Sequence, residues 1–254
     1  MAADGHRHVL AIGGLRDFDT IGSDADGVPL LGAYAARLSG SNAPKICILN
    51  TASGDDPAAS VRTYQFFGAV AGRVTHLQLF PMPSTADPEE LLLSQDVIFV
   101  GGGSVANMLA VWRVHGLDRV MASAWQAGIV LAGVSAGAIC WFTAGTTDSF
   151  GTDLRPFTDG LGLLTPSYCP HYDSEPGRRP LYRSLVASGA LPPGIACDDG
   201  AAAHFVDDAL AEIVTDRPAA RGYLVARSEG DVAAETPLEG RYLLERPPAG
   251  LLGG

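Results

Sequence analysis

The chain has 254 residues, of which 47% are hydrophobic and 18% charged. This is the composition of a globular protein and excludes disorder as its main state. Lys and Arg total 17 against 28 Asp and Glu, a formal net charge of −11, so the chain would repel a phosphate backbone and nucleic acid is not expected as a partner. The length fits one large α/β domain or two small ones.

Targeting and membrane signals are weak. The first eight residues lack the apolar core of a secretory signal, and the four cysteines lie far apart without a C-x-x-C pair, which favours a reducing, cytoplasmic location. The uncharged stretch 120–147 is long enough to cross a bilayer. Because it contains four glycines and several polar residues, we interpret it as a helix end, a buried strand and a second buried helix, and expect no membrane contact.

Buried strands and helices alternate in the first half of the chain. Strands are predicted at 9–13, 45–50, 74–80, 97–100 and 129–133. Helices are predicted at 30–38, 57–71, 88–93, 104–115 and 117–127. This alternation indicates an α/β fold with a mostly parallel sheet flanked by helices on both faces.

The pattern changes after Ser149. A Gly/Pro-rich connection leads to Tyr168-Cys-Pro-His171 and to a helix predicted at 178–188. The last quarter is β-rich and either extends the sheet or forms hairpins at its edge. Its predicted strands are 194–197, 201–206, 210–214, 223–226 and 241–245. We find no repeat and no linker, so a single domain over 1–254 is predicted, with loose ends at about 1–7 and 246–254.

Residues Gly133-Val-Ser-Ala-Gly137 match G-x-S-x-G, the strand-to-helix turn that exposes a serine at the carboxyl edge of a sheet. The glycines permit a sharp turn and close backbone approach, and the following helix presents N–H groups to developing negative charge. Ser135 is therefore a candidate nucleophile. The alternative is that the small residues only allow tight helix–sheet packing.

A nucleophilic serine needs a general base, and the base needs an orienting acid. Among six histidines, His171 is the candidate because it follows Pro170 in a loop after the sheet and precedes a polar cluster. A surface-loop histidine without a role is the alternative. Spacing does not select the acid. The acidic candidates are Asp148, Asp173, Glu175, Asp198 and Asp199.

The run Gly101-Gly102-Gly103 follows the predicted strand 97–100 and opens a helix at Ser104. Backbone N–H groups placed there suit an oxyanion or a phosphate, and a tight turn capped by Ser104 is the alternative. Neither G-x-G-x-x-G nor a Walker pattern is completed, so nucleotide binding is not expected.

Five elements follow one another in a characteristic order. They are Phe99–Gly103 with Asn107, Gly133–Gly137, Thr146–Asp148, Pro170–His171 and Gly194–Gly200. Together they resemble the peptidase E family of serine peptidases, whose fold is similar to that of class I glutamine amidotransferases. The resemblance spans about 9–205. It implies Ser135 as nucleophile and His171 as base, and offers Asp148 or the carboxylate before Gly200 as the acid. We favour Asp199 slightly, and keep Asp148 and Asp198 as candidates.

The resemblance implies cofactor-free and metal-free hydrolysis of small peptides through an acyl-enzyme on Ser135. The N–H groups of Ala136 and of Gly102 or Gly103 would hold the oxyanion. Aspartyl dipeptidases of this family cleave after an N-terminal aspartate and hold its carboxylate with arginine. The substrate-binding candidates here are Asn107, Arg178 and Arg179. A small peptide is the expected partner, and a homodimer is compatible with the sequence.

Three alternatives remain open. An α/β-hydrolase esterase would use the same serine with the late His204 as base. A cyanophycinase-like peptidase would cut an aspartate–arginine polymer. A catalytically silent binding module would keep the fold without the chemistry.

Overall fold

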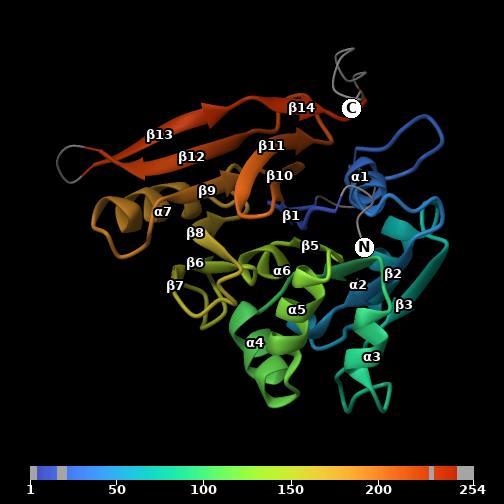
Figure 1. Cartoon of the computed structure of the whole chain (residues 1–254). Coiled ribbons are helices and arrows are strands. Elements are labelled where there is room, and N and C mark those ends of the chain that lie inside the picture. The colour runs from blue at the N-terminus through green and yellow to red at the C-terminus, as the bar shows by residue number, and fades with distance from the viewer. Residues whose placement is uncertain (1–4, 16–21, 229–231, 245–254) are drawn as a thin grey trace.

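The computed structural model describes residues 5–15, 22–228 and 232–244 (Figure 1). Within these ranges the chain forms two sheets. The larger has the strand order β14-β11-β10-β1-β5-β4-β2-β3, and the smaller β13-β12-β9-β8-β6-β7. The predicted α/β architecture with helices on both faces of a mostly parallel sheet is confirmed for the larger sheet.

The larger sheet has a parallel centre and an antiparallel flank. Its strands are β1 (His8–Ile12), β2 (Lys45–Leu49), β3 (Arg73–His76), β4 (Val97–Val100), β5 (Val130–Val134), β10 (Ala201–Val206), β11 (Ala209–Thr215) and β14 (Gly240–Tyr242). Strands β1, β5, β4, β2 and β3 are parallel, whereas β10 pairs antiparallel with β1 and β11 antiparallel with β10. The carboxyl ends of the parallel strands therefore meet at one edge.

Alternating side chains of the central strands enter two separate cores. Val9 and Ala11 of β1 pack in a cluster with α4 and α5, and Leu10 and Ile12 pack in another with α1 and α2, as the two-residue period of a strand requires. Figure 1 shows α3, α4 and α5 gathered on one side of the sheet. The helices are α1 (Leu30–Leu38), α2 (Pro57–Phe67), α3 (Pro88–Leu93), α4 (Val105–Val114), α5 (Leu117–Gln126) and α6 (Ala136–Ile139), with a 3₁₀ turn η2 (Thr51–Ser53).

The smaller sheet carries the second half of the chain. Its strands are β6 (Phe142–Thr147), β7 (Arg155–Phe157), β8 (Leu164–Cys169), β9 (Gly194–Cys197), β12 (Gly222–Arg227) and β13 (Ala233–Leu238). Strands β6, β8 and β9 run parallel. Helix α7 (Arg178–Ala187) packs against β12 and β13, which Figure 1 shows as a long antiparallel pair.

The prediction of a second buried helix in 120–147 was wrong beyond its first turn. Helix α6 stops at Ile139, and the chain enters β6 at Phe142. Trp141 packs on Trp112 of α4, and the threonines that follow favour a strand because they are β-branched. Strands β6, β7, β8 and β13 were not predicted, and the predicted strand 74–80 and helix 57–71 both end early, at 76 and 67. Residue 245 and the predicted C-terminal tail lie outside the described ranges.

None of the helices in the described part of the chain is long and apolar enough to span a membrane. All four cysteines are buried free thiols.

The two sheets meet where β1 ends, at Gly13 and Gly14. The Gly13 N–H donates to the carbonyl oxygen of Ala201 (2.9 Å), the His171 N–H to that of Gly13 (3.3 Å), and the Gly200 N–H to that of Gly14 (2.9 Å). A Cβ on Gly14 would lie 2.5 Å from His171 Nδ1 and closer still to a carboxylate oxygen of Asp199. Only glycine lets the strand ends of the smaller sheet approach β1 this closely.

Candidate active site

Ser135 lies in the turn between β5 and α6. Its backbone has φ 55° and ψ −117°, a conformation that is rare for a residue with a side chain. A Cβ on Gly133 would collide with the carbonyl oxygen of Gly137, so the glycines of this motif allow the helix to start directly against the strand. The N–H of Ala136, at the first position of α6, has no acceptor within the helix, whereas those of Ala138 and Ile139 donate to the Ser135 carbonyl oxygen (2.9 Å each).

A chain of hydrogen bonds joins Ser135, His171 and Asp199. The Ser135 hydroxyl lies 2.8 Å from His171 Nε2, and His171 Nδ1 lies 2.8 Å from a carboxylate oxygen of Asp199. Because the carboxylate accepts from Nδ1, Nε2 is left to accept the serine proton. Ser135 comes from the larger sheet, whereas His171 and Asp199 follow β8 and β9 of the smaller one.

The other acidic candidates point elsewhere. The Asp148 side chain is 56% exposed and lies 4.0 Å from the guanidinium of Arg178. Asp198 accepts a hydrogen bond from the N–H of Arg221 (3.0 Å). The structure thus brings Asp199, and neither Asp148 nor Asp198, to His171.

Two further residues hold the backbone of Asp199 from both sides. The Asp199 N–H donates to the Asp173 carboxylate (2.8 Å), and Arg217 Nε donates to the Asp199 carbonyl oxygen (2.8 Å). Arg217 also pairs with Asp173 (2.6 Å). The sequence marked Asp173 only as one acid near His171, and no local signal marked Arg217, because it is more than 40 residues from Asp173 and meets it only in the folded chain.

Asp198 carries a buried carboxyl beside this cluster. Burial, reinforced by the negative charge of Asp173, raises its pKa to about 6. Among the described residues one of its oxygens has no hydrogen-bond partner. The ionised carboxylate is therefore destabilised in the folded protein.

The glycines after β4 lie beside the serine. A Cβ on Gly102 would be 3.3 Å from the Ser135 Cβ, and Gly102 lines the cavity described below. Gly103, at φ 135°, is exposed and does not line this cavity. Of the two predicted glycine donors, Gly102 has the better position.

A cavity of about 830 Å³ extends from Ser135 across the ends of β4 and β2 to α2. Its lining residues come from the strand ends and from one face of α2. They are Leu15, Asn50, Ser53, Asp56, Ala59, Arg62, Thr63, Phe66, Phe99, Gly101, Gly102, Val134, Ser135 and His171. Asn50, Asp56 and Arg62 were not recognised in the sequence, because they belong to no motif. Only the fold brings Asn50, at the end of β2, beside Asp56 and Arg62 of the α2 region.

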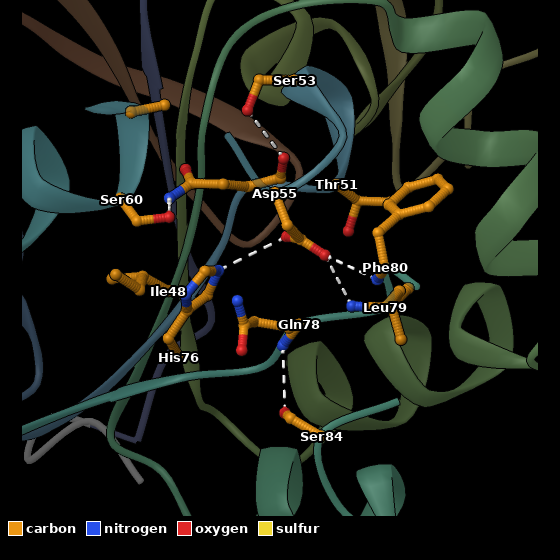
Figure 2. Close-up of polar contacts among 12 residues, drawn as sticks. Ile48, Thr51, Ser53, Asp55, Ser60, His76, Gln78, Leu79, Phe80 and Ser84 are labelled. Atoms are coloured by element: carbon orange, nitrogen blue, oxygen red, sulfur yellow. Dashed lines mark hydrogen bonds and ion pairs between the residues drawn. The ribbon is translucent and has the colours of Figure 1, made fainter. Parts of the chain in front are cut away.

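Asp55 anchors the turn that leads into α2. Figure 2 shows its carboxylate between His76 and the N–H groups of Leu79 and Phe80. The carboxylate lies 3.4 Å from the ring of His76 and accepts from Leu79 at 2.6 Å and from Phe80 at 3.0 Å. Burial alone would raise the pKa of Asp55, but these partners outweigh it and lower the pKa. Asp55, between the wall residues Ser53 and Asp56, thereby ties this turn to the end of β3 and to the segment that follows it.

The predicted substrate-binding residues do not reach the cavity. Arg178 is buried at 2% exposure, donates to the Thr146 carbonyl oxygen (2.6 Å) and pairs with Glu175 (2.7 Å). Arg179 pairs with Glu235. Asn107 is exposed on α4 and is absent from the lining. The expectation that Arg178 and Arg179 face the substrate is corrected, because both guanidinium groups have internal partners.

His204 is not the base of Ser135. Its Nε2 lies 3.0 Å from His8 Nδ1, and its Nδ1 lies 2.9 Å from the hydroxyl of Tyr34. Both ring nitrogens are therefore occupied in a buried network on the α1 side of β10. The esterase alternative that depended on this histidine is wrong in its choice of base.

The chain is similar in sequence to known peptidases. The model of peptidase family S51 matches residues 24–213. The uncharacterized peptidase YgaJ of Bacillus subtilis (strain 168) is 44% identical over 215 residues, which cover 84% of this chain and 91% of that protein.

Solved structures agree on the fold. A peptidase from an acI-B1 Actinobacterium aligns with TM-score 0.65 at 16% identity, covering 93% of this chain and 96% of that one. A protein from Listeria monocytogenes EGD-e assigned to peptidase E aligns with TM-score 0.57 at 17% identity, covering 84% and 98%.

The fold, the presence of Ser135 in the turn after β5 and the match to a peptidase family together define this protein as a serine-type peptidase. The chain belongs to peptidase family S51, the peptidase E family that the sequence resembles.

Replacing the two acids separately distinguishes them. Asp199→Asn should lower kcat by about 10³- to 10⁴-fold, because the amide no longer holds the imidazole in the tautomer that accepts the serine proton. Asp148→Asn should leave kcat within about twofold, as expected for an exposed site. Steady-state peptide hydrolysis checks both, and a larger loss in Asp148→Asn would contradict the assignment.

Gly14→Ala should lower kcat by about 10²-fold or more, because the added methyl group displaces the His171 ring or the Asp199 carboxylate. Those atoms are side-chain ends that can move, so the protein should remain folded. Gly177→Ala is the control, since its Cβ would contact only Leu154 Cδ1 at 3.1 Å. Equal activity of the two variants would show that the close approach at Gly14 is unimportant.

Asp198 should make stability depend on pH. Its folded pKa of about 6 exceeds the ordinary value near 4, so the folded protein binds this proton more tightly than the unfolded chain does. The resulting stabilisation is fully present below pH 4 and is lost as the pH rises through 6. Between pH 4 and 7 the wild type should lose on the order of 2 kcal/mol of unfolding free energy relative to Asp198→Asn. Urea denaturation of both proteins at several pH values measures this difference. If the unfolding free energies of the wild type and Asp198→Asn change equally with pH, the prediction is wrong.

Proposed function

We propose that this serine peptidase hydrolyses short peptides through an acyl-enzyme on Ser135. In the proposed reaction the Ser135 oxygen attacks the peptide carbonyl while His171 Nε2 takes its proton, and Asp199 holds the resulting imidazolium. The C–N bond then breaks, and His171 returns the proton to the leaving amine. Water next attacks the ester by the same base catalysis, which releases the acid product and restores the serine.

The observation that carries this proposal is the continuous chain from hydroxyl to imidazole to carboxylate at 2.8 Å and 2.8 Å. A silent binding module would have no need of the unusual backbone at Ser135. The N–H groups of Ala136 and Gly102 are the proposed oxyanion donors, with Gly103 as the outer alternative. One donor of this kind is typically worth about 3 kcal/mol of transition-state stabilisation.

The cavity supports small substrates. Its volume of about 830 Å³ falls in the range of small-molecule sites. Helix α2 forms one of its walls, so the site is a pocket and not a groove open along its length. We therefore propose dipeptidase-like activity, with an N-terminal aspartate as the candidate acyl residue. No cofactor takes part in the proposed reaction.

A fluorophosphonate probe tests the nucleophile directly. The wild type should be labelled at Ser135, because the base activates its hydroxyl, and Ser135→Ala should not be labelled. Ser123→Ala, an exposed serine of α5, is the matched control and should be labelled like the wild type. Intact-mass spectrometry gives the readout. Folded wild-type protein that stays unlabelled would favour the silent module.

A dipeptide library assayed by release of amino acids tests the substrate class. The expected result is hydrolysis of some dipeptides by the wild type and none by Ser135→Ala. Hydrolysis of simple esters or of an aspartate–arginine polymer, without hydrolysis of any dipeptide, would replace this proposal with the esterase or the cyanophycinase-like alternative.

A further inference from the structure

We infer that Asp55 is a positioning residue for the proposed reaction and that it acts through the glycine loop, residues 101–103, which carries the proposed oxyanion donor Gly102. This inference rests on the proposed function and adds to it a residue that does not line the cavity. The Asp55 side chain is buried at 2% exposure. Because burying a carboxylate is costly unless it is bound, its contacts indicate what it holds in place.

The glycine loop is attached at both ends to the end of β2 and to the 3₁₀ turn η2. The Gly101 N–H donates to the carbonyl oxygen of Leu49 (2.9 Å). The N–H of Ser104, the first residue after the loop, donates to that of Ala52 (2.8 Å). Between these two bonds the Gly102 N–H has no acceptor among the described residues. Its direction therefore depends on where the end of β2 and η2 lie.

The loop also packs directly against η2. A Cβ on Gly103 would collide with the carbonyl oxygen of Ala52, so only glycine permits this approach. Trp112 of α4, the helix that follows the loop, donates its indole N–H to the Thr51 hydroxyl (3.3 Å). A displacement of η2 would thus be transmitted to the glycine loop.

Asp55 closes the turn that contains η2. Its N–H donates to the carbonyl oxygen of Asn50 (3.0 Å), and the Gly54 N–H donates to that of Thr51 (3.0 Å). Gly54 and Asp55 both have a positive φ, at 69° and 57°. Glycine adopts this conformation without strain, whereas an aspartate is held in it by the surrounding contacts.

The Asp55 carboxylate supplies those contacts, from the end of β3 and the segment after it (Figure 2). Its Oδ2 accepts from the N–H groups of both Leu79 and Phe80 (2.6 and 3.0 Å). Its Oδ1 faces His76 Nε2 at 3.4 Å, and neither of these two buried atoms has a hydrogen bond among the described residues. Asp55 therefore fixes one end of a turn whose other end holds the glycine loop.

This connection should affect turnover more than substrate binding. The Gly102 N–H would bind an oxyanion that forms only as the carbonyl is attacked. Misplacing a group at a reacting centre by about 1 Å costs about 100-fold in rate. If Asp55 served only to support the cavity wall, its loss would raise KM and leave kcat unchanged.

Asp55→Gly tests the connection, because glycine keeps the left-handed backbone and removes only the carboxylate. With the dipeptide that the wild type cleaves fastest, kcat should fall by about 10- to 100-fold and KM should change by less than about threefold. Asp55→Asn should recover most of kcat. Its amide oxygen can accept from Leu79 and Phe80 while its NH₂ group faces His76.

Asp207→Gly is the matched control. Asp207, between β10 and β11, also has a positive φ (55°) and accepts from the N–H and Nε of Arg7 (3.3 and 2.9 Å). It lies beside the start of β1, whereas the glycine loop follows the end of the parallel strand β4. Asp207→Gly should keep the kcat and KM of the wild type. An equal loss in both variants, a loss confined to KM, or an unchanged kcat in Asp55→Gly would overturn the inference.

Amide hydrogen exchange, resolved by NMR, separates this inference from the proposed reaction. The Gly101 and Ser104 N–H groups should exchange at least about tenfold faster in Asp55→Gly than in the wild type, because their acceptors are no longer held. The amides of β10 and β11 should keep their rates. An equal rise across both regions would show a general loss of stability and would overturn the local connection.

The two readouts fail in different ways. If fluorophosphonate does not label the wild type yet the exchange of Gly101 and Ser104 rises in Asp55→Gly, the proposed reaction fails while Asp55 still positions the glycine loop. If labelling occurs but neither exchange nor kcat differs between Asp55→Gly and Asp207→Gly, the inference about Asp55 alone is refuted.

Discussion

The close approach of the smaller sheet to the end of β1 is the constraint on which the candidate site depends. The Gly13 N–H donates to Ala201, and the carbonyl oxygens of Gly13 and Gly14 accept from His171 and Gly200. The strand ends that carry His171 and Asp199 are therefore held against the sheet that carries Ser135. Any side chain at Gly14 would occupy the space of His171 and Asp199. The arrangement of Ser135, His171 and Asp199 thus depends on the junction between the two sheets and on neither sheet alone.

Asp199 is held by hydrogen bonds at both its N–H and its carbonyl oxygen. The Asp199 N–H donates to the Asp173 carboxylate, and its carbonyl oxygen accepts from Arg217. Asp173 and Arg217 also form an ion pair with each other. Its neighbour Asp198 faces away and is kept partly protonated near pH 6 by burial and by the charge of Asp173. The two neighbouring aspartates therefore differ because their surroundings differ. The Asp199 carboxylate lies against the His171 imidazole, whereas burial raises the pKa of Asp198.

Charge is distributed unevenly around the site. The chain carries a net charge of −11, and several of its arginines are committed to internal carboxylates, as in Arg178 with Glu175, Arg179 with Glu235 and Arg217 with Asp173. Within the described lining of the cavity Arg62 provides the one guanidinium. Arg178 and Arg179, the arginines expected there from the family resemblance, have internal partners instead.

The sequence by itself determined the alternating strands and helices, the elbow around Ser135 and, through its motifs, His171, since strand periodicity and glycine positions are local signals. It favoured Asp199 only slightly over Asp148 and did not find Gly14, Arg217 or Arg62, because each depends on contacts between segments far apart in the chain. It also missed β6, β7, β8 and β13. At β6 the chain leaves the helix-like run after the elbow because its residues pair with β7 and β8. Only the tertiary structure decided these, since a hydrogen bond or an internal ion pair depends on which side chains the fold brings within about 3 Å.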